Sequence, residues 1–176
     1  MTAPEPAGAT VLPLRRPPIR RSTVVASDRQ HTFDVFVATI GTWWPVDPIS
    51  AGGDRVRDVT FEQRPGGRVY ETWADGTTVD WGVVRTWEPP HRFVMSWLVT
   101  GTPTEVELTF TALGSATTRV AVEHRGWEAL SDAELSADCA EPGGYAGGSF
   151  ARGWATILDS FAARLGGPLR TCEETP

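Results

Sequence analysis

Lysine is absent from this sequence of 176 residues, so all sixteen basic residues are arginine. This absence excludes Schiff-base enzymes, Ser-Lys dyads and P-loop nucleotide hydrolases, all of which need a lysine. Cysteine is scarce, and Cys139 and Cys172 show no paired spacing, which predicts reduced thiols in a cytoplasmic protein. His31, His91 and His124 do not stand at metal-ligand spacing. We therefore expect no metal and no cofactor.

Long apolar runs are also missing. No run approaches the roughly 18 residues of a membrane span, so we expect no membrane insertion. The net charge is −6, and positive charge concentrates only in Arg15, Arg16, Arg20 and Arg21. Without residues 1–21 the chain holds 12 basic and 21 acidic residues, a net charge of −9. Such a charge repels phosphate backbones, which argues against a nucleic-acid partner.

The length fits one domain with flanking segments. Residues 1–18 are rich in Pro, Ala and Arg and lack the apolar segment of a secretory signal, so they are interpreted as a disordered lead-in. Residues 19–166 are predicted to form the folded domain, and residues 167–176 a flexible tail. The sequence leaves a homodimer open.

Most of the chain has the pattern of short strands divided by turn residues. The predicted strands cover residues 19–26, 55–63, 68–73, 78–87, 91–99, 105–110 and 119–123. The turns between them include Asp75-Gly76, a strong hairpin signal, and Gly114-Ser115. In the last two strands apolar and polar residues alternate, which predicts one buried and one wet face. The order predicts an antiparallel meander.

Helical signals flank this meander. Ser27-x-x-Gln30 is a capping box that predicts a short helix ending at Gly41, and a helical turn is expected near residues 131–137. A long helix is predicted from Ser149, interpreted as its N-cap, to residue 165. Its apolar stripe comprises Phe150, Trp154, Ile157, Leu158, Phe161 and Leu165.

The predicted class is therefore α+β. A curved antiparallel sheet of about six or seven strands wraps around the long C-terminal helix, with one or two short helices after the first strand. Gly153 interrupts that helix at a cost of about 1 kcal/mol relative to Ala. It predicts close approach by the sheet or a ligand, which would make the helix a lid along a cavity.

Tryptophan is the most informative residue type, because eight occur and a buried indole N–H needs a partner. Alternate strand residues share a face, so Val79, Trp81, Val83, Arg85 and Trp87 are predicted to lie together. If such faces turn towards the helix, they line an aromatic cavity; the alternative is that they only fill the core. The candidate ligand-binding residues are Trp43, Trp44, Val69, Glu71, Trp73, Trp81, Met95, Trp97, Phe110, His124, Trp154 and Leu158.

Two ionisable residues share predicted inward faces with apolar neighbours. Glu71 lies between Val69 and Trp73, and His124 continues the parity of Val120 and Val122. Burial would raise the pKa of the carboxyl and lower that of the imidazole. Both are candidates for acid/base catalysis or for orienting a ligand. The alternative is that both are buried groups satisfied by backbone or arginine.

Several short motifs occur in a specific order. They are WWP at 43–45, PGGRVYE at 65–71, WGVV at 81–84, WEPPHRF at 87–93, VAVEH at 120–124 and GW at 153–154. Together they resemble the START-like, or Bet v 1-like (SRPBCC), helix-grip superfamily, and within it the bacterial proteins related to the activator of Hsp90 ATPase. The likeness covers about residues 19–165. It implies a sheet gripping a C-terminal helix around an apolar cavity.

Members of this superfamily bind lipids, polyketides and other hydrophobic molecules, and a minority catalyse cyclisation or hydrolysis. The resemblance therefore implies non-catalytic binding of a hydrophobic small molecule. The alternative enzyme would use His124 or Glu71. A chaperone partner is not expected, because the sequence shows no N-terminal co-chaperone domain.

A narrower resemblance is to the enediyne self-resistance proteins, which sequester the antibiotic and are cleaved in its place. WWP, TRVAVEH at 118–124 and GWATIL at 153–158 carry it. Gly114 corresponds to the sacrificial glycine of that family. Its alternative role is that of an ordinary turn residue.

Overall fold

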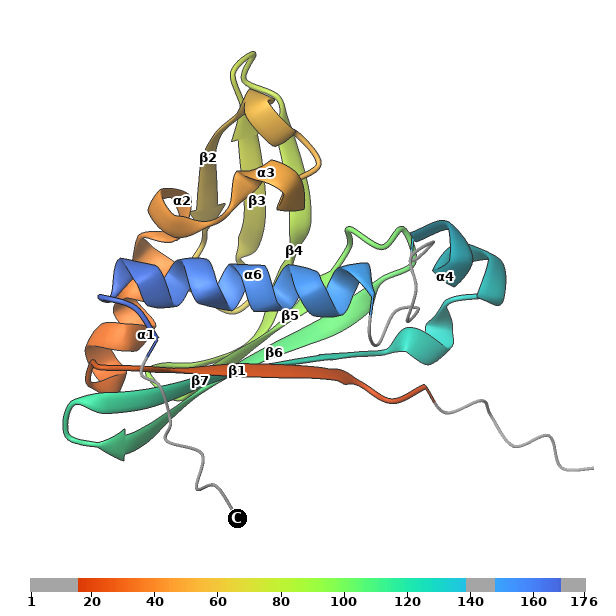
Figure 1. Cartoon of the computed structure of the whole chain (residues 1–176). Helices are drawn as coiled ribbons and strands as arrows, with labels where there is room; N and C mark the ends of the chain where they lie inside the picture. The colour runs from red at the N-terminus through yellow and green to blue at the C-terminus, as the bar shows by residue number, and fades with distance from the viewer. Residues whose placement is uncertain (1–15, 139–147, 169–176) are drawn as a thin grey trace, which may run out of the picture.

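A seven-stranded antiparallel sheet curls around one long helix, α6, as Figure 1 shows. The structure is a computed structural model that describes residues 16–138 and 148–168. The strand order is β1-β7-β6-β5-β4-β3-β2, so the first two strands of the sequence form opposite edges. The strands are β1 (Ile19–Val25), β2 (Val56–Phe61), β3 (Arg68–Trp73), β4 (Thr78–Glu88), β5 (Arg92–Trp97), β6 (Thr104–Gly114) and β7 (Thr117–Arg125).

Short helices occupy the connections. α1 (Arg29–Ala38), α2 (Ile40–Trp43), α3 (Val46–Ile49) and η1 (Gly53–Arg55) join β1 to β2. η2 (Trp127–Ala129) and α4 (Asp132–Asp138) follow β7, and α6 (Ser149–Arg164) closes the domain. The predicted α+β helix-grip architecture is confirmed.

The helix boundaries differ from the sequence predictions in three places. Asp28, not Ser27, caps α1, because its carboxylate accepts the backbone N–H of His31 at 3.0 Å. α1 ends at Ala38 with Thr39 as its C-cap, so Gly41 lies inside α2. A Cβ at Gly41 would lie 3.1 Å from the carbonyl oxygen of Val59, so the glycine lets β2 approach. Gly148 occupies the N-cap of α6, and Ser149 is the first helical residue.

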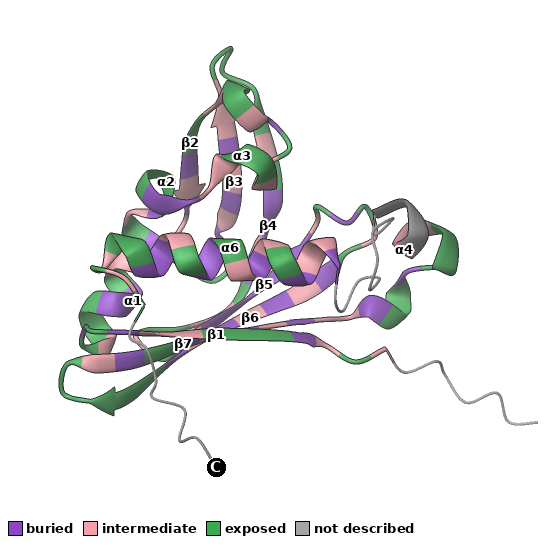
Figure 2. Ribbon diagram, in the orientation of Figure 1, coloured by how far each residue is buried: buried purple, intermediate pink, exposed green. Residues whose placement is uncertain are grey.

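One face of α6 packs onto the sheet, as the buried stripe in Figure 2 shows. Its buried residues are Ala151, Trp154, Ile157, Leu158, Phe161 and Ala162. Gly153 is half-buried, and a Cβ there would meet only the Cδ1 atom of Ile49 at 3.7 Å, an ordinary contact. The predicted close approach of the sheet to Gly153 is therefore wrong, because the one neighbouring atom belongs to α3 and not to a strand.

The predicted flanking segments fall mostly outside the described residues, which exclude 1–15 and 169–176. Within the description, Arg16 donates to the carbonyl oxygen of Trp127 at 2.9 Å and pairs with Asp132 at 2.5 Å. Pro168 forms an isolated β-bridge with Val25. Cys139 and Cys172 lie outside the described residues. Among the described helices, none is long and apolar enough to cross a membrane.

Candidate functional site

A cavity of about 240 Å³ opens where the ends of β4 and β5 meet the segment that contains α3. Its walls are apolar and aromatic except for Asp80, whose carboxylate pairs with Arg68 at 2.5 Å. Val99, at 46% exposure, forms part of its lining. The lining residues are Trp44, Ile49, Ala51, Val79, Asp80, Trp81, Trp97, Leu98 and Val99.

An irregularity of β4 places Trp81 in this wall. Val69 pairs with Gly82 and Tyr70 with Asp80, so Trp81 is an extra residue with no partner on β3. Such β-bulges bend a strand and re-aim a side chain. A second register shift, between Val84 and Thr86, follows on the β5 side.

The two shifts overturn the predicted common face of β4. Strict alternation would bury Val83 and Arg85 with Trp81, yet Arg85 is exposed and Val83 only half-buried. Val84 is buried instead, at 1% exposure. The residue added at Trp81 reverses the parity of Val83 and Arg85, which explains the error. The second shift restores the parity, and Trp87 packs against the core as predicted.

Glu71 is fully buried on β3 and accepts hydrogen bonds from two tryptophans. Its Oε1 accepts the indole N–H of Trp73 at 2.7 Å, and its Oε2 accepts that of Trp81 at 3.1 Å. Oε1 also accepts the backbone N–H of Gly52 at 2.9 Å. Three N–H donors thus satisfy the carboxylate, which fixes Trp81 against the cavity and ties the loop at Gly52 to the sheet.

His124 is fully buried on β7, and both of its ring nitrogens are engaged. Trp154 donates its indole N–H to Nδ1 at 3.1 Å, and the hydroxyl of Thr104 lies 2.7 Å from Nε2. Because an indole nitrogen can only donate, Nδ1 must be unprotonated, which leaves the proton on Nε2. The contacts therefore define one neutral tautomer, in which Nε2–H donates to Thr104.

Burial lowers the pKa of His124 from 6.5 to about 3. The rings of Trp97, Trp127 and Trp154 surround the imidazole, with centroids 5.9, 4.2 and 6.1 Å from it. This desolvation disfavours the charged imidazolium. The predicted burial of His124 and the predicted direction of its pKa shift are both confirmed.

The structure brings only part of the predicted residue set to the cavity. Trp44, Trp81 and Trp97 line it, and Glu71 lies behind Trp81. The indole of Trp97 lines the cavity and also contacts His124 and Trp154, with its ring centroid 5.3 Å from that of Trp154. The remaining predicted residues, Trp43, Val69, Trp73, Met95, Phe110 and Leu158, are not among the lining residues.

The other end of the interior is packed with phenylalanine. Phe36 contacts the rings of Trp43, Phe110 and Phe161 at centroid distances of 4.7, 5.5 and 4.9 Å. Phe33 adds a contact with Phe110 at 5.0 Å. Trp43 and Phe110 thus belong to a filled core, as the alternative interpretation predicted for them.

Several lining residues had not been predicted as site residues. Ile49 and Ala51 lie in or just after α3, and Leu98 and Val99 follow β5. Segments of this kind carry no periodic apolar pattern. The sequence offered one signal for a further lining residue. Val79 is two residues before Trp81 on the same strand, so it was predicted to share its face.

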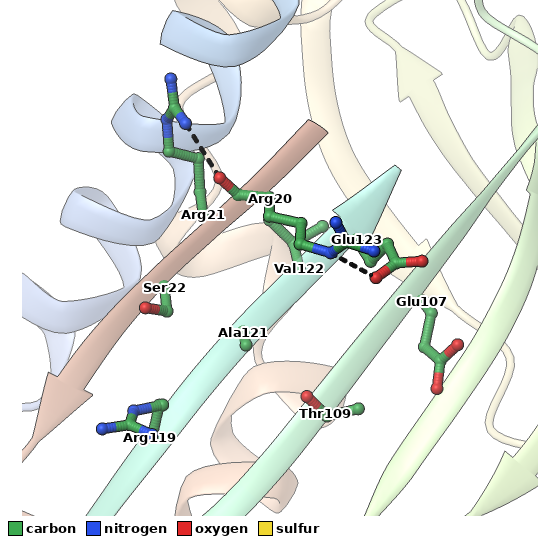
Figure 3. A pocket seen from close by; sticks show the side chains of 9 residues that line it. All are labelled: Arg20, Arg21, Ser22, Glu107, Thr109, Arg119, Ala121, Val122 and Glu123. Carbon is green, nitrogen blue, oxygen red and sulfur yellow. Dashed lines mark hydrogen bonds and ion pairs between the residues drawn. The ribbon is translucent and has the colours of Figure 1, made fainter. Parts of the chain in front are cut away.

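A larger hollow, of about 610 Å³, lies on the outer face of β1, β7 and β6 (Figure 3). Arg119 and Glu123 point to this face because they alternate with the buried Val120, Val122 and His124. Arg20 pairs with Glu123 at 2.7 Å across it, as the dashed line in Figure 3 marks. Its walls are open and charged, so it does not suit an apolar ligand.

Gly114 ends β6 at the tip of the hairpin with β7. It is exposed, its φ lies outside the left-handed region, and a Cβ there would meet nothing within 4 Å. Trp97 pairs with Thr104 at the opposite end of β6. Ten residues of strand, roughly 30 Å, therefore separate Gly114 from the cavity end of the sheet.

Comparison with protein families identifies the chain. The model described as activator of Hsp90 ATPase homolog 1-like protein matches residues 39–166. The chain belongs to this family. The match includes α6 and every strand except β1, and the predicted resemblance to the helix-grip superfamily is confirmed.

Solved structures of the same fold include two with more than 25% identity. One is an anthrahydroquino-γ-pyrone synthase, Txn09, with 29% identity and a TM-score of 0.52, covering 84% of this chain and 96% of that chain. The other is CalC, a self-sacrificing resistance protein from Micromonospora echinospora, with 27% identity and a TM-score of 0.59, covering 85% and 94%.

DynU16, from the dynemicin biosynthetic locus, shares the fold at 16% identity and a TM-score of 0.54, covering 88% of this chain and 49% of that chain. A search of curated proteins gives no match. Within residues 16–138 and 148–168, no three or more His, Cys, Asp or Glu side chains gather as a metal site would require.

Proposed function

We propose that this family member binds a compact, hydrophobic aromatic molecule of the polyketide type in the cavity between Trp44, Trp81 and Trp97. The observation that carries the proposal is the aromatic wall itself. A β-bulge at Trp81 and a hydrogen bond to the buried carboxylate of Glu71 hold this wall in place. Small-molecule sites are typically apolar, with few polar groups that are fixed in place. The cavity has this character.

The similarity to Txn09 and CalC supports the same class of ligand. One is described as a γ-pyrone synthase and the other as a resistance protein, and both share more than a quarter of their aligned residues with this chain. The volume of about 240 Å³ lies below the range of roughly 300–1,000 Å³ common for drug-sized ligands. It favours a ligand of two or three fused rings over a long acyl chain.

No catalytic role is proposed for Glu71 or His124. Three N–H donors contact the Glu71 carboxylate, and both nitrogens of His124 are engaged. These contacts support a structural role in which each group holds tryptophan rings in place.

Calorimetric titration with a panel of bicyclic and tricyclic aromatics, lipids and flavonoids tests the proposal. We expect saturable one-to-one binding of fused-ring aromatics. Val79→Phe, which places a ring in the cavity, should weaken that binding at least tenfold. Val83→Phe, on the same strand but outside the lining, is the matched control. Absence of binding across the panel, or equal affinity in both variants, would contradict the proposal.

A second candidate is sequestration of an enediyne with cleavage near Gly114. The specific observation is that nothing in the local geometry requires glycine at this exposed position. The strand separation described above means that a molecule in the aromatic cavity does not contact Gly114. The two functions would therefore use separate surfaces.

Mass spectrometry after enediyne exposure tests this candidate. We expect scission confined to the neighbourhood of Gly114. Gly76, in another exposed hairpin turn, provides an internal control. Equal scission at both turns, or none, would remove the self-resistance candidate without affecting the binding proposal.

A further inference from the structure

Trp97, at the end of β5, belongs to two groups of aromatic rings at once. It lines the cavity together with Trp44 and Trp81. Its ring also contacts those of Trp154 and His124, at centroid distances of 5.3 and 5.9 Å. Neither Trp154 nor His124 is among the lining residues. The space that the Trp97 side chain fills is therefore bordered both by the cavity and by this second group of rings.

The second group of rings is held together without Trp97. Trp154 donates its indole N–H to Nδ1 of His124 at 3.1 Å, and Trp127 donates to the His124 carbonyl oxygen at 2.8 Å. Phe150 packs against Trp127, with ring centroids 5.0 Å apart. Because the hydrogen bonds tie the two indoles to β7, these rings keep their places when a neighbouring side chain is shortened. A void made at Trp97 should therefore stay open, since a void closes only as far as its surroundings can relax.

The other two indoles of the cavity wall have different surroundings. Trp81 donates to the buried Glu71 carboxylate, so its removal takes a donor from that acceptor. Trp44 lies against Trp43, at a centroid distance of 5.9 Å, and the Trp43 ring belongs to the filled end of the core. The indole N–H of Trp97 has no acceptor within the described part of the chain. Shortening Trp97 therefore breaks no described hydrogen bond of its side chain and enlarges the cavity towards rings that do not yet line it.

We infer that Trp97 determines the size of the ligand, because its indole admits a compact fused-ring aromatic and excludes a molecule that carries a further ring on the same core. This inference rests on the proposed function and names the residue that sets its size limit. The cavity of about 240 Å³ is small, so one side chain decides whether an added ring fits. A ring that meets the indole must displace buried side chains, which a close-packed interior resists.

The alternative is that a larger ligand extends out of the cavity past Val99, which lines it at 46% exposure. The affinity for the larger ligand would then not depend on the side chain at position 97. A pair of ligands that differ by one ring separates the two cases.

Chromone and flavone are the probes, because flavone is chromone with one added phenyl ring. Calorimetry should show that the wild-type protein binds chromone about tenfold more tightly than flavone. In Trp97→Leu the phenyl ring can occupy the space of the lost indole. The ratio of chromone affinity to flavone affinity should therefore fall about tenfold or more, as expected for the burial of one apolar ring.

A spectroscopic measurement locates the added ring. In Trp97→Leu with 15N-labelled tryptophan, flavone should shift the indole resonance of Trp154 more than chromone does. Trp97→Phe shortens the side chain less and should give an affinity ratio between those of the wild type and Trp97→Leu. Trp87→Leu, which shortens a tryptophan of β4 outside the cavity lining, is the matched control and should leave the ratio within twofold of the wild type.

The outcomes are distinct. An unchanged ratio in both Trp97 variants, or equal affinity of the wild type for the two probes, would overturn the inference and leave the binding proposal intact. An equal change in Trp87→Leu would also overturn it, because looser packing anywhere in the core would then be the cause. If neither probe nor any member of the aromatic panel binds to the wild type, the proposed function itself fails.

Discussion

Beneath the C-terminal half of α6 the interior is filled with phenylalanine rings, whereas beneath its N-terminal half tryptophans surround Glu71, His124 and a cavity. The first region packs around Phe36 and Phe161 and, apart from Trp43 and Trp87, its aromatic rings have nothing to donate. The second is held by directed hydrogen bonds. The comparison teaches that close packing fixes one end of this sheet, while polar anchoring keeps the other end partly open.

The largest expected effect lies at the phenylalanine end. Phe161 is fully buried between Phe36 and Trp43, at centroid distances of 4.9 and 5.0 Å. Phe161→Ala should lower the free energy of unfolding by about 3–5 kcal/mol, because it leaves a void in a filled core. Urea denaturation measures the loss. The affinity of the folded variant for fused-ring aromatics should stay within twofold, and a larger loss would show that the two ends are coupled.

At the tryptophan end the next largest effect depends on pH. The pKa of His124 falls from 6.5 to about 3 on folding, so between these values the unfolded chain binds the extra proton. The His124 contribution is therefore complete above pH 6.5 and is lost as pH falls towards 3. At pH 4.5 the loss should reach about 3 kcal/mol, at roughly 1.4 kcal/mol per pH unit.

His124→Gln is the matched variant, because its amide can accept from Trp154 and donate to Thr104 without titrating. The difference in stability between the two proteins, measured from pH 7 to pH 4.5, should shrink by the amount given above. Parallel pH profiles would show that the imidazole does not carry this acid sensitivity.

A smaller effect is expected for Glu71→Gln. The amide retains one acceptor oxygen, but its NH2 group must face an N–H donor. The free energy of unfolding should fall by about 1–3 kcal/mol. Glu105→Gln, at an outer ion pair with Arg125, is the control and should cost about 1 kcal/mol or less. If both variants lose the same free energy of unfolding, the hydrogen bonds of Glu71 do not anchor the tryptophans.

The smallest expected effect is a difference in stability between alanine variants of two helical glycines. Gly153→Ala has room beside Ile49 and should stabilise the protein by up to about 1 kcal/mol through helix propensity. Gly41→Ala should destabilise it instead, because the new Cβ would crowd the backbone of Val59. Thermal denaturation compares the pair. If Gly153→Ala destabilises the protein instead, another part of the structure must approach Gly153 closely.

The sequence was sufficient for the sheet because its signals are local. Asp75-Gly76 and Gly114-Ser115 lie where the chain turns, and residues 68–73 were bounded correctly as β3. Burial of Glu71 and His124 followed from strict alternation on regular strands. The same rule failed on β4, because alternation cannot reveal an extra residue such as Trp81.

The candidate site was only partly predictable. Trp44, Trp81 and Trp97 were expected from their residue type. Ile49 and Leu98 reach the cavity through connections whose course depends on tertiary packing, which no periodic pattern encodes. The indole N–H groups of Trp44 and Trp97, which have no acceptor among the described residues, could not be foreseen either, because hydrogen-bond partners are set by atoms distant in sequence.

The strand order also determines when the strands can pair during synthesis on the ribosome. Ile19 of β1 pairs with His124 of β7, so β1 leaves the ribosome about 100 residues before its partner strand. At roughly 5–20 residues per second, that interval lasts on the order of 5–20 s. During it β1 waits as an unpaired segment, and the edge of β7 stays open until β1 docks. The pairing of β1 with β7 joins strands that are far apart in sequence, which makes sealing of this edge a late event of biosynthesis.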